Sequence, residues 1–180
     1  SEPQTHWCQF TYFHRPRING IAPRCGPVTG GTTVAIYGDN LFETSEIRVA
    51  FTLVSGGCLI VDGYCEGGVV RCVAPQLPTE HSTSQTVGVD VALNGSDYTG
   101  GKVTFEYYGR IALIAVHPPL APWNVAVPIT VFLSGLVRSD HALARVAYPV
   151  GEARAGLSMQ GTISDARDSI STILPACSVL

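Results

Sequence analysis

The sequence is poor in charge, since only 14% of its 180 residues are charged and the formal net charge is −3. Lysine is rare, methionine occurs once, and the 11 Lys and Arg residues are scattered along the chain. A nucleic-acid-binding protein needs a basic patch to neutralise phosphates, so this balance argues against nucleic acid as a partner. The 46% hydrophobic content is enough to build a buried core, which excludes a disordered chain.

The sequence also lacks an uncharged apolar run of the ~20 residues that a membrane-spanning helix needs. Its most apolar stretch, Ile111–Leu136, is interrupted by His117, four prolines and Asn124. We therefore expect no membrane contact by this segment itself. The N-terminal residues SEPQTHWCQF do not resemble a signal peptide, so either a signal has been removed or the chain belongs to a longer protein.

Catalytic and cofactor motifs are absent. No G-x-S-x-G nucleophile motif, no C-x2-C zinc pair and no Asp-x-Asp-x-Asp-Gly calcium loop occurs, and the five histidines are isolated. Gly26 and Gly31 have the G-x4-G spacing of a phosphate loop, but Thr32 stands where the loop needs Lys, and a strand is expected next in place of a helix. We expect no enzyme, no catalytic residue, no metal and no cofactor.

Glycine and proline are plentiful, and they separate short runs in which apolar and polar residues alternate. This pattern is typical of strands joined by turns. The seven candidate strands are Arg17–Ala22, Thr32–Tyr37, Ile47–Phe51, Cys58–Asp62, Val69–Ala74, Thr86–Leu93 and Lys102–Tyr107. They predict an all-β, immunoglobulin-like β-sandwich. Ser164–Ser171 is the one stretch for which a helical turn is expected.

An internal repeat divides the chain. FTYFHRPRINGIAP (residues 10–23) is similar to FEYYGRIALIAVHP (105–118) at an offset of 95, and VRCVAP (70–75) is similar to ISTILP (170–175) at an offset of 100. The repeat predicts three parts: residues 1–14 as the last strand of a preceding unit, 15–108 as a complete unit, and 109–180 as a second, divergent and incomplete unit. A longer tandem array explains this arrangement, as does strand exchange between copies of the chain.

The stretch PRINGIAPRCGPVTGGTTVAIYGDNLF resembles the opening of an IPT/TIG domain, the immunoglobulin-like module found in plexins and transcription factors. The strand VRCVAPQLP and the final hairpin VGVDVALNGSDYTGGKVTFEYY fit the same family. The resemblance implies a turn that carries the fold signature, formed by Gly26, Pro27, Gly30, Gly31, Thr32, Gly38 and Asn40. The second unit departs from the family pattern, since Leu120–Asn124 replaces the glycine-rich corner and Thr172 stands where the first unit has Cys72.

By position, the resemblance also implies a disulfide between Cys58 and Cys72, with Cys65 as a competing partner. The pairing of Cys8, Cys25 and Cys177 stays open. Six cysteines without metal-site spacing favour the secretory pathway, although buried thiols in a cytosolic protein are the alternative. Asn94-Gly95-Ser96 is an N-glycosylation sequon in a polar turn, which points the same way. We therefore expect an extracellular or cell-surface protein.

Aromatic residues flank the short linkers between units. Phe13 and its counterpart Tyr108 are expected to pack near the start of the following unit, beside Pro16 and Arg110 respectively. Such packing restricts hinge motion and suits a rod, a stalk or a filament. These four residues are the predicted inter-domain contacts.

Three functions follow from this organisation. The first is an extracellular structural or protein-interaction module that binds other proteins, neighbouring copies or glycans. The second is the repeating subunit of an extracellular filament or coat, such as a ciliary surface filament, assembled through inter-domain or strand-completing contacts. The third is an intracellular dimerisation domain of the transcription-factor type.

Overall fold

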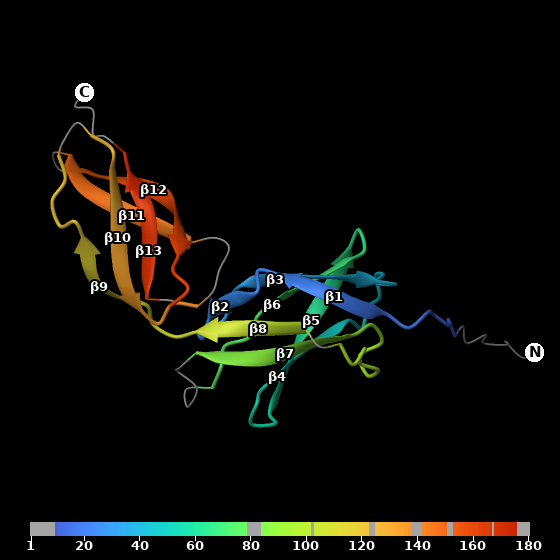
Figure 1. Cartoon of the computed structure of the whole chain (residues 1–180). Coiled ribbons are helices and arrows are strands. Elements are labelled where there is room, and N and C mark those ends of the chain that lie inside the picture. The colour runs from blue at the N-terminus through green and yellow to red at the C-terminus, as the bar shows by residue number, and fades with distance from the viewer. Residues whose placement is uncertain are drawn as a thin grey trace, which may run out of the picture.

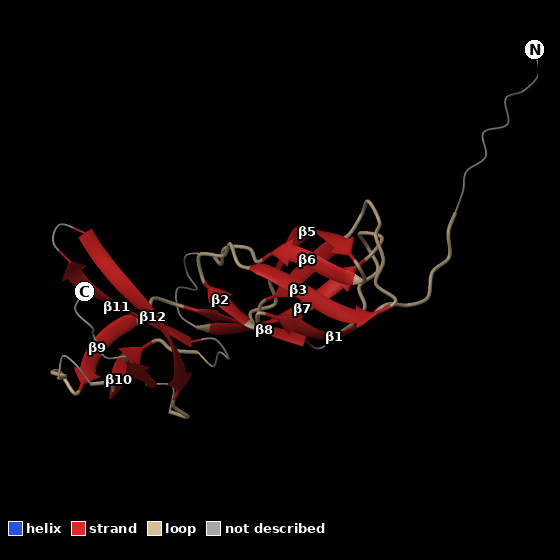
Figure 2. Ribbon diagram, turned by 90° about the horizontal axis from the view of Figure 1, so that it is seen from above, coloured by secondary structure: helices blue, strands red, loops and turns tan. Residues whose placement is uncertain are grey.

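The computed structural model describes residues 10–78, 84–101, 103–122, 125–137, 142–150, 153–166 and 168–175, without the side chains of 145–150 and 153–157. Within these ranges the chain forms strands and no helix (Figure 2). Figure 1 shows two bodies that follow one another along the chain, one built from β1–β8 and the other from β9–β13. The structure is therefore all-β, as predicted.

Eight strands form the first unit, and their hydrogen-bonded order is β1-β3-β6-β5-β4-β7-β8-β2. Their bounds are β1 Arg17–Ala22, β2 Cys25–Pro27, β3 Thr33–Asp39, β4 Arg48–Thr52, β5 Cys58–Glu66, β6 Val69–Val73, β7 Gln85–Ala92 and β8 Val103–Tyr108. All neighbours are antiparallel except β2 and β8, which run parallel. The seven predicted strands are present, and most of their ends lie within one or two residues of prediction.

Two differences from the predicted strands have physical reasons. The strand predicted to end at Asp62 continues to Glu66, because the first half of β5 pairs with β4 and its second half pairs with β6. β5 thus passes from one layer of the sandwich to the other. The second difference is β2, which lies in the expected turn at Gly26 and Pro27 and is too short to show an alternating pattern.

The core of the first unit lies between the two layers. Its largest fully buried side chains are Phe51 of β4 with Phe105 and Tyr107 of β8. The rings of Phe105 and Tyr107 meet edge to face at 4.9 Å, and the ring of Phe51 lies 6.0 Å from that of Phe105. Burial raises the pKa of the Tyr107 hydroxyl, which donates a hydrogen bond of 2.8 Å to the carbonyl of Pro75. Aromatic burial of this kind supplies much of the hydrophobic stabilisation of a small domain.

Five strands form the second unit, in the order β11-β12-β13-β10-β9. Their bounds are β9 Ala112–His117, β10 Val127–Ser134, β11 Ala142–Val150, β12 Ala153–Ile163 and β13 Ser169–Leu174. The helical turn expected at Ser164–Ser171 is wrong. Ser164 and Asp168 instead close a tight turn between β12 and β13, in which the Ser164 amide donates to the Ser169 carbonyl at 2.9 Å and the Ser164 hydroxyl to the Asp168 carboxylate at 2.8 Å.

The second sheet repeats part of the ladder of the first. β9, β10, β13, β12 and β11 follow one another in the same order as β1, β3, β6, β5 and β4. The register repeats as well, at sequence offsets of 95 and 100. The corresponding cross-strand pairs are Val34–Cys72 with Ile129–Thr172 and Ile36–Val70 with Val131–Ile170.

Candidate interaction surfaces

The glycine-rich corner carries the chain from β2 to β3, two strands at different positions in the ladder. Gly30 has a positive φ of 73°, and a Cβ there would lie 2.6 Å from the backbone nitrogen of Gln76. Gly31 donates its amide to the carbonyl of Ala74 at 2.9 Å, and Ala74 donates to the carbonyl of Thr32 at 2.8 Å. The corner therefore packs backbone against backbone, a close approach that favours glycine.

The rest of the predicted signature lies at this corner and at the opposite end of β3. Gly26 and Pro27 form part of β2, where a Cβ on Gly26 would meet the ring of Phe105 at 2.7 Å. Gly38 lies in β3 against the backbone of Arg17, and Asn40 follows with a positive φ of 57°. These residues thus serve the crossing of the chain and the end of β3.

A second surface is the linker pole, which we define as residues 13–16 with the loops 40–46 and 94–100. Phe13 packs edge to face on Phe42 with ring centroids 5.3 Å apart, and Pro16 is buried. Arg15 donates from its guanidinium to the carbonyl of Thr99 at 3.2 Å and accepts from the Asn40 amide at 3.2 Å through its own carbonyl. The linker residues Phe13 and Pro16 therefore lie against the first unit, beside a groove of about 420 Å³.

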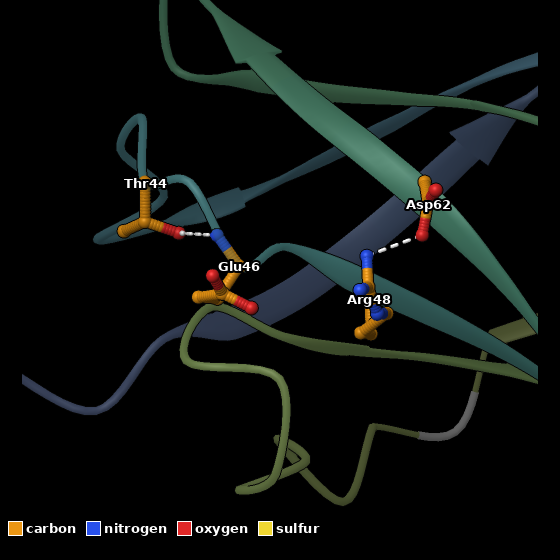
Figure 3. A network of polar contacts seen from close by, with 4 residues as sticks. All are labelled: Thr44, Glu46, Arg48 and Asp62. Atoms are coloured by element: carbon orange, nitrogen blue, oxygen red, sulfur yellow. Dashed lines mark hydrogen bonds and ion pairs between the residues drawn. The ribbon is translucent and has the colours of Figure 1, made fainter.

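Figure 3 shows polar contacts within the loop 40–46 of the linker pole and between the strands that follow it. The Thr44 hydroxyl accepts from the Glu46 amide at 3.4 Å and donates to the Leu93 carbonyl. Two residues after Glu46, Arg48 at the start of β4 forms an ion pair with Asp62 of β5, its direct cross-strand neighbour. Both side chains are exposed, so we expect the pair to contribute less than about 1 kcal/mol.

Asn94 lies exposed in the loop between β7 and β8. Its carbonyl oxygen accepts from the amides of Ser96 at 3.2 Å and Asp97 at 2.8 Å, and its side-chain nitrogen donates to the Asp97 carboxylate at 2.7 Å. The loop is thus held by the sequon asparagine itself. One of the two hydrogens on that nitrogen satisfies Asp97, which leaves the other for a glycosidic bond.

The predicted disulfide between Cys58 and Cys72 is wrong, because Cys58, Cys65 and Cys72 carry thiols. Cys58 begins β5 opposite Thr52, whereas Cys72 lies opposite Gly63, five residues further along the same strand. At ~3.3 Å per residue this separation exceeds twice the ~7 Å between Cα atoms that a disulfide spans. Cys58 is exposed, while burial raises the pKa of the Cys72 thiol to about 12.

The junction between the two units begins where β8 ends. The carbonyl of Tyr108 accepts from the Val28 amide at 2.9 Å, so its backbone extends the pairing of β8 with β2. The Arg110 side chain is exposed, and its carbonyl lies 2.8 Å from the position of a Cβ on Gly135, which follows β10. The predicted junction residues therefore lie against different units, Tyr108 on the first and Arg110 on the second.

A third surface is the open face of the second unit, which we define as the apolar groove of about 270 Å³ on one face of β9–β13. Leu113 of β9 and Leu143 of β11 are 65% and 67% exposed there. The sequence predicted an incomplete unit but not this groove, because the groove depends on which strands lie side by side. The side chains that line it include Leu113, Val116, Val131, Leu133, Leu143 and Ile170.

The described residues contain no group of three His, Cys, Asp or Glu side chains placed to hold a metal ion. No helix with the length and apolar character of a membrane span occurs in the same ranges.

Two residues of the linker pole and its surroundings were not predicted from the sequence. The ring of Phe42 packs on Phe13, and the carboxylate of Asp90 accepts from the Thr99 hydroxyl and the Gly100 amide. These contacts join segments that are distant in the sequence, so no local pattern predicts them.

The sequence profile of the IPT/TIG domain matches residues 16–107, which is half of the chain. The chain therefore belongs to the IPT/TIG family, a class of immunoglobulin-like modules that are not themselves catalytic. The predicted family and fold class are confirmed.

Several characterised proteins share similarity with this chain over limited regions. Human plexin-A4 is 28% identical over 119 residues, which is 64% of this chain and 6% of plexin-A4. The flagellar outer arm dynein alpha chain of Chlamydomonas reinhardtii is 31% identical over 93 residues, 51% of this chain and 2% of the dynein chain. The probable serine/threonine-protein kinase drkC of Dictyostelium discoideum is 25% identical over 64% of this chain and 15% of the kinase. This chain thus spans only a small part of each relative.

The solved structure of the full extracellular region of plexin A4 superposes with a TM-score of 0.55 and 20% sequence identity, covering 93% of this chain and 13% of the plexin chain. At this identity the likeness concerns the fold. It supports the immunoglobulin-like fold of this chain.

Proposed function

We propose that this chain is a non-enzymatic, extracellular segment of a cell-surface or secreted protein, in which tandem IPT/TIG units act as a structural or protein-interaction module. The observation that carries the proposal is the IPT/TIG match over residues 16–107, together with the likeness of the fold to an extracellular plexin region. The family resemblance points to function through surfaces rather than through catalysis.

The surfaces of the molecule support a protein partner. The linker pole combines an aromatic pair, Phe13 and Phe42, with polar groups that include Arg15 and Asp97 around its groove. Apolar and aromatic groups beside hydrogen-bonding groups are the usual composition of a protein-binding surface. We propose other proteins or neighbouring copies as partners, with glycans as a further class, and neither nucleic acid nor a membrane.

Strand exchange between copies of the chain, which the repeat in the sequence allows, would make this chain a filament subunit. This is a second candidate function. The observation that favours it is the open face of the second unit. The third candidate, an intracellular dimerisation domain of the transcription-factor type, has less support. Such a domain works beside DNA, whereas this chain has a formal net charge of −3 and its Lys and Arg residues are scattered along the sequence.

The location of the native protein tests the proposal. An antibody against this segment is applied to intact cells and to permeabilised cells from the same culture. We expect equal labelling of both and loss of the epitope when intact cells are treated with protease. Labelling that requires permeabilisation would overturn the proposal in favour of the intracellular alternative.

Asn94 provides a finer test with its own control. We propose that this sequon is glycosylated, so a glycosidase specific for N-linked glycans should lower the mass of the native protein. The Asn94→Gln variant should lose the shift, while Asn19→Gln, which changes an asparagine outside any sequon, should keep it.

A further inference from the structure

Asn94, the sequon residue, lies beside the groove of the linker pole. Its side-chain nitrogen donates to the Asp97 carboxylate at 2.7 Å, and Asp97 is one of the residues that line the groove. The backbone of Asn94 is bridged to that of Glu46 in the loop 40–46, which fixes the base of the side chain. A sugar attached to this nitrogen would therefore begin a hydrogen bond's length from the lining of the groove.

One wall of the groove is the segment 96–99, which follows the sequon. Its end is held by β7, because the carboxylate of Asp90 accepts from the Thr99 hydroxyl and from the Gly100 amide at 2.8 Å. Its start is held by the carbonyl oxygen of the Asn94 side chain, which accepts from the first two amides of the wall. This wall is thus ordered without a ligand, which lowers the entropic cost of binding one.

The other wall is the linker, residues 13–16. The Arg15 guanidinium donates to the Thr99 carbonyl at 3.2 Å, which ties the two walls together. The ring of Phe13 packs on Phe42, yet 40% of Phe13 stays exposed. The linker therefore presents an accessible aromatic ring and a guanidinium to the same groove.

The lining of the groove suits an N-acetylated sugar. The rings of Phe13 and Tyr98 can pack against the C–H face of a sugar ring or its acetyl methyl group. Arg15 has five N–H donors for the acetamido carbonyl, and the Asp97 carboxylate accepts from hydroxyls. The volume of about 420 Å³ lies within the ~300–1,000 Å³ of small-molecule sites.

We propose that the groove of the linker pole holds the first sugars of a glycan on Asn94 of the same chain. The inference rests on the proposed glycosylation of Asn94 and goes beyond it, because a glycan can also extend into solvent without touching the protein. A sugar in the groove would contact both the segment 96–99 and the linker 13–16, which are far apart in the sequence. The glycan would thus hold the linker against the first unit.

The direct test is NMR of the full glycosylated chain with an isotope-labelled glycan. We expect cross-relaxation between the acetyl methyl of the first sugar and the ring protons of Phe13 or Tyr98, and an upfield shift of that methyl signal. Both effects should persist on dilution, because the sugar and the groove belong to one chain. Loss of the cross-relaxation on dilution would overturn the proposal, since the sugar of a second copy would then be the occupant.

Stability provides an independent measure of the contact. Each chain is prepared with the glycan from a secretory host and without it from bacteria, and the urea midpoint of the first unit is compared between the two forms. We expect the glycan to raise the midpoint of the parent chain. Phe13→Ser with Arg15→Ser should abolish most of this rise, while any cost of the substitutions themselves is present in both forms and cancels.

Tyr64→Ser is the matched control for the double variant. Tyr64 is 52% exposed on β5 and does not line the groove, so its variant should keep the full rise in urea midpoint.

Mass analysis of the Asn94 peptide separates two failures. If Asn94 carries no glycan, the proposed glycosylation fails and this inference fails with it. If Asn94 carries a glycan that shows no cross-relaxation to either ring, or a rise in midpoint that the double variant keeps, the glycosylation stands and the assignment of the groove is overturned.

Discussion

Replacing Gly30 by alanine tests the role of the glycine-rich corner, because its neighbour Gly31 offers a matched control. Both residues have positive φ, 73° and 86°, so alanine at either position costs roughly 1–2 kcal/mol of left-handed strain. The surroundings differ. A Cβ on Gly30 would lie within 2.6–2.8 Å of backbone atoms of Ala74, Pro75 and Gln76, whereas a Cβ on Gly31 would meet nothing within 4 Å.

Backbone atoms cannot rotate away as a side chain does, so Gly30→Ala adds an overpacking cost of about 1–3 kcal/mol. We therefore expect Gly30→Ala to destabilise the first unit by about 2–5 kcal/mol and Gly31→Ala by about 1–2 kcal/mol. The assay is a urea titration followed through the amide resonances of β3 and β6, which report on the first unit alone. Equal destabilisation by the two substitutions would refute the packing argument.

Three further predictions concern single side chains of the first unit. Cys58 should react with iodoacetamide in the native state, whereas Cys72 should react only on unfolding, and equal alkylation rates would contradict this. Burial raises the pKa of the Cys72 thiol in the folded state to about 12, so above pH ~9 only the unfolded state loses its proton, and the unfolding free energy should fall as pH rises from about 9 toward 12. Tyr107→Phe removes the hydroxyl that donates to a carbonyl and should cost about 1 kcal/mol in a urea titration, and a cost of zero would show that water replaces the bond. Arg48→Ala should change the same free energy by less than about 1 kcal/mol, and the loss should shrink as salt is added, because an exposed ion pair is screened. A larger loss that salt does not reduce would mean that the pair is more than a surface contact.

Local patterns predicted most of the strands of the first unit, because alternation and turn residues are properties of neighbouring positions. They predicted β1 to the residue and placed the glycine corner at the right point of the chain. The family pattern narrowed the prediction from an all-β sandwich to the IPT/TIG type, because its glycines mark places where two backbone segments pack closely. Gly30 is one of them, since its backbone lies against that of residues 74–76. The organisation into a preceding strand, a complete unit at 15–108 and an incomplete unit at 109–180 stays a prediction.

The failures share one cause, which is that they depend on contacts between distant segments. The Cys58–Cys72 bridge was transferred by position, yet the register of β5 sets the two residues five positions apart. β2 is a strand only because β8 lies beside it, and the loop at Ser164 turns because β12 and β13 pair. The grooves of the linker pole and the second unit follow from the same long-range pairing.

Hydrogen exchange tests most directly the claim that the core of the first unit is covered on both sides, whereas the apolar face of β9–β13 is accessible among the described residues. It is measured by mass spectrometry at a concentration where the chain is monomeric. We predict that peptides from β3, β4 and β7 exchange only through unfolding of the whole first unit, whereas those from β9 and β11 exchange far sooner. Equal protection of β11 and its equivalent β4 would contradict the claim.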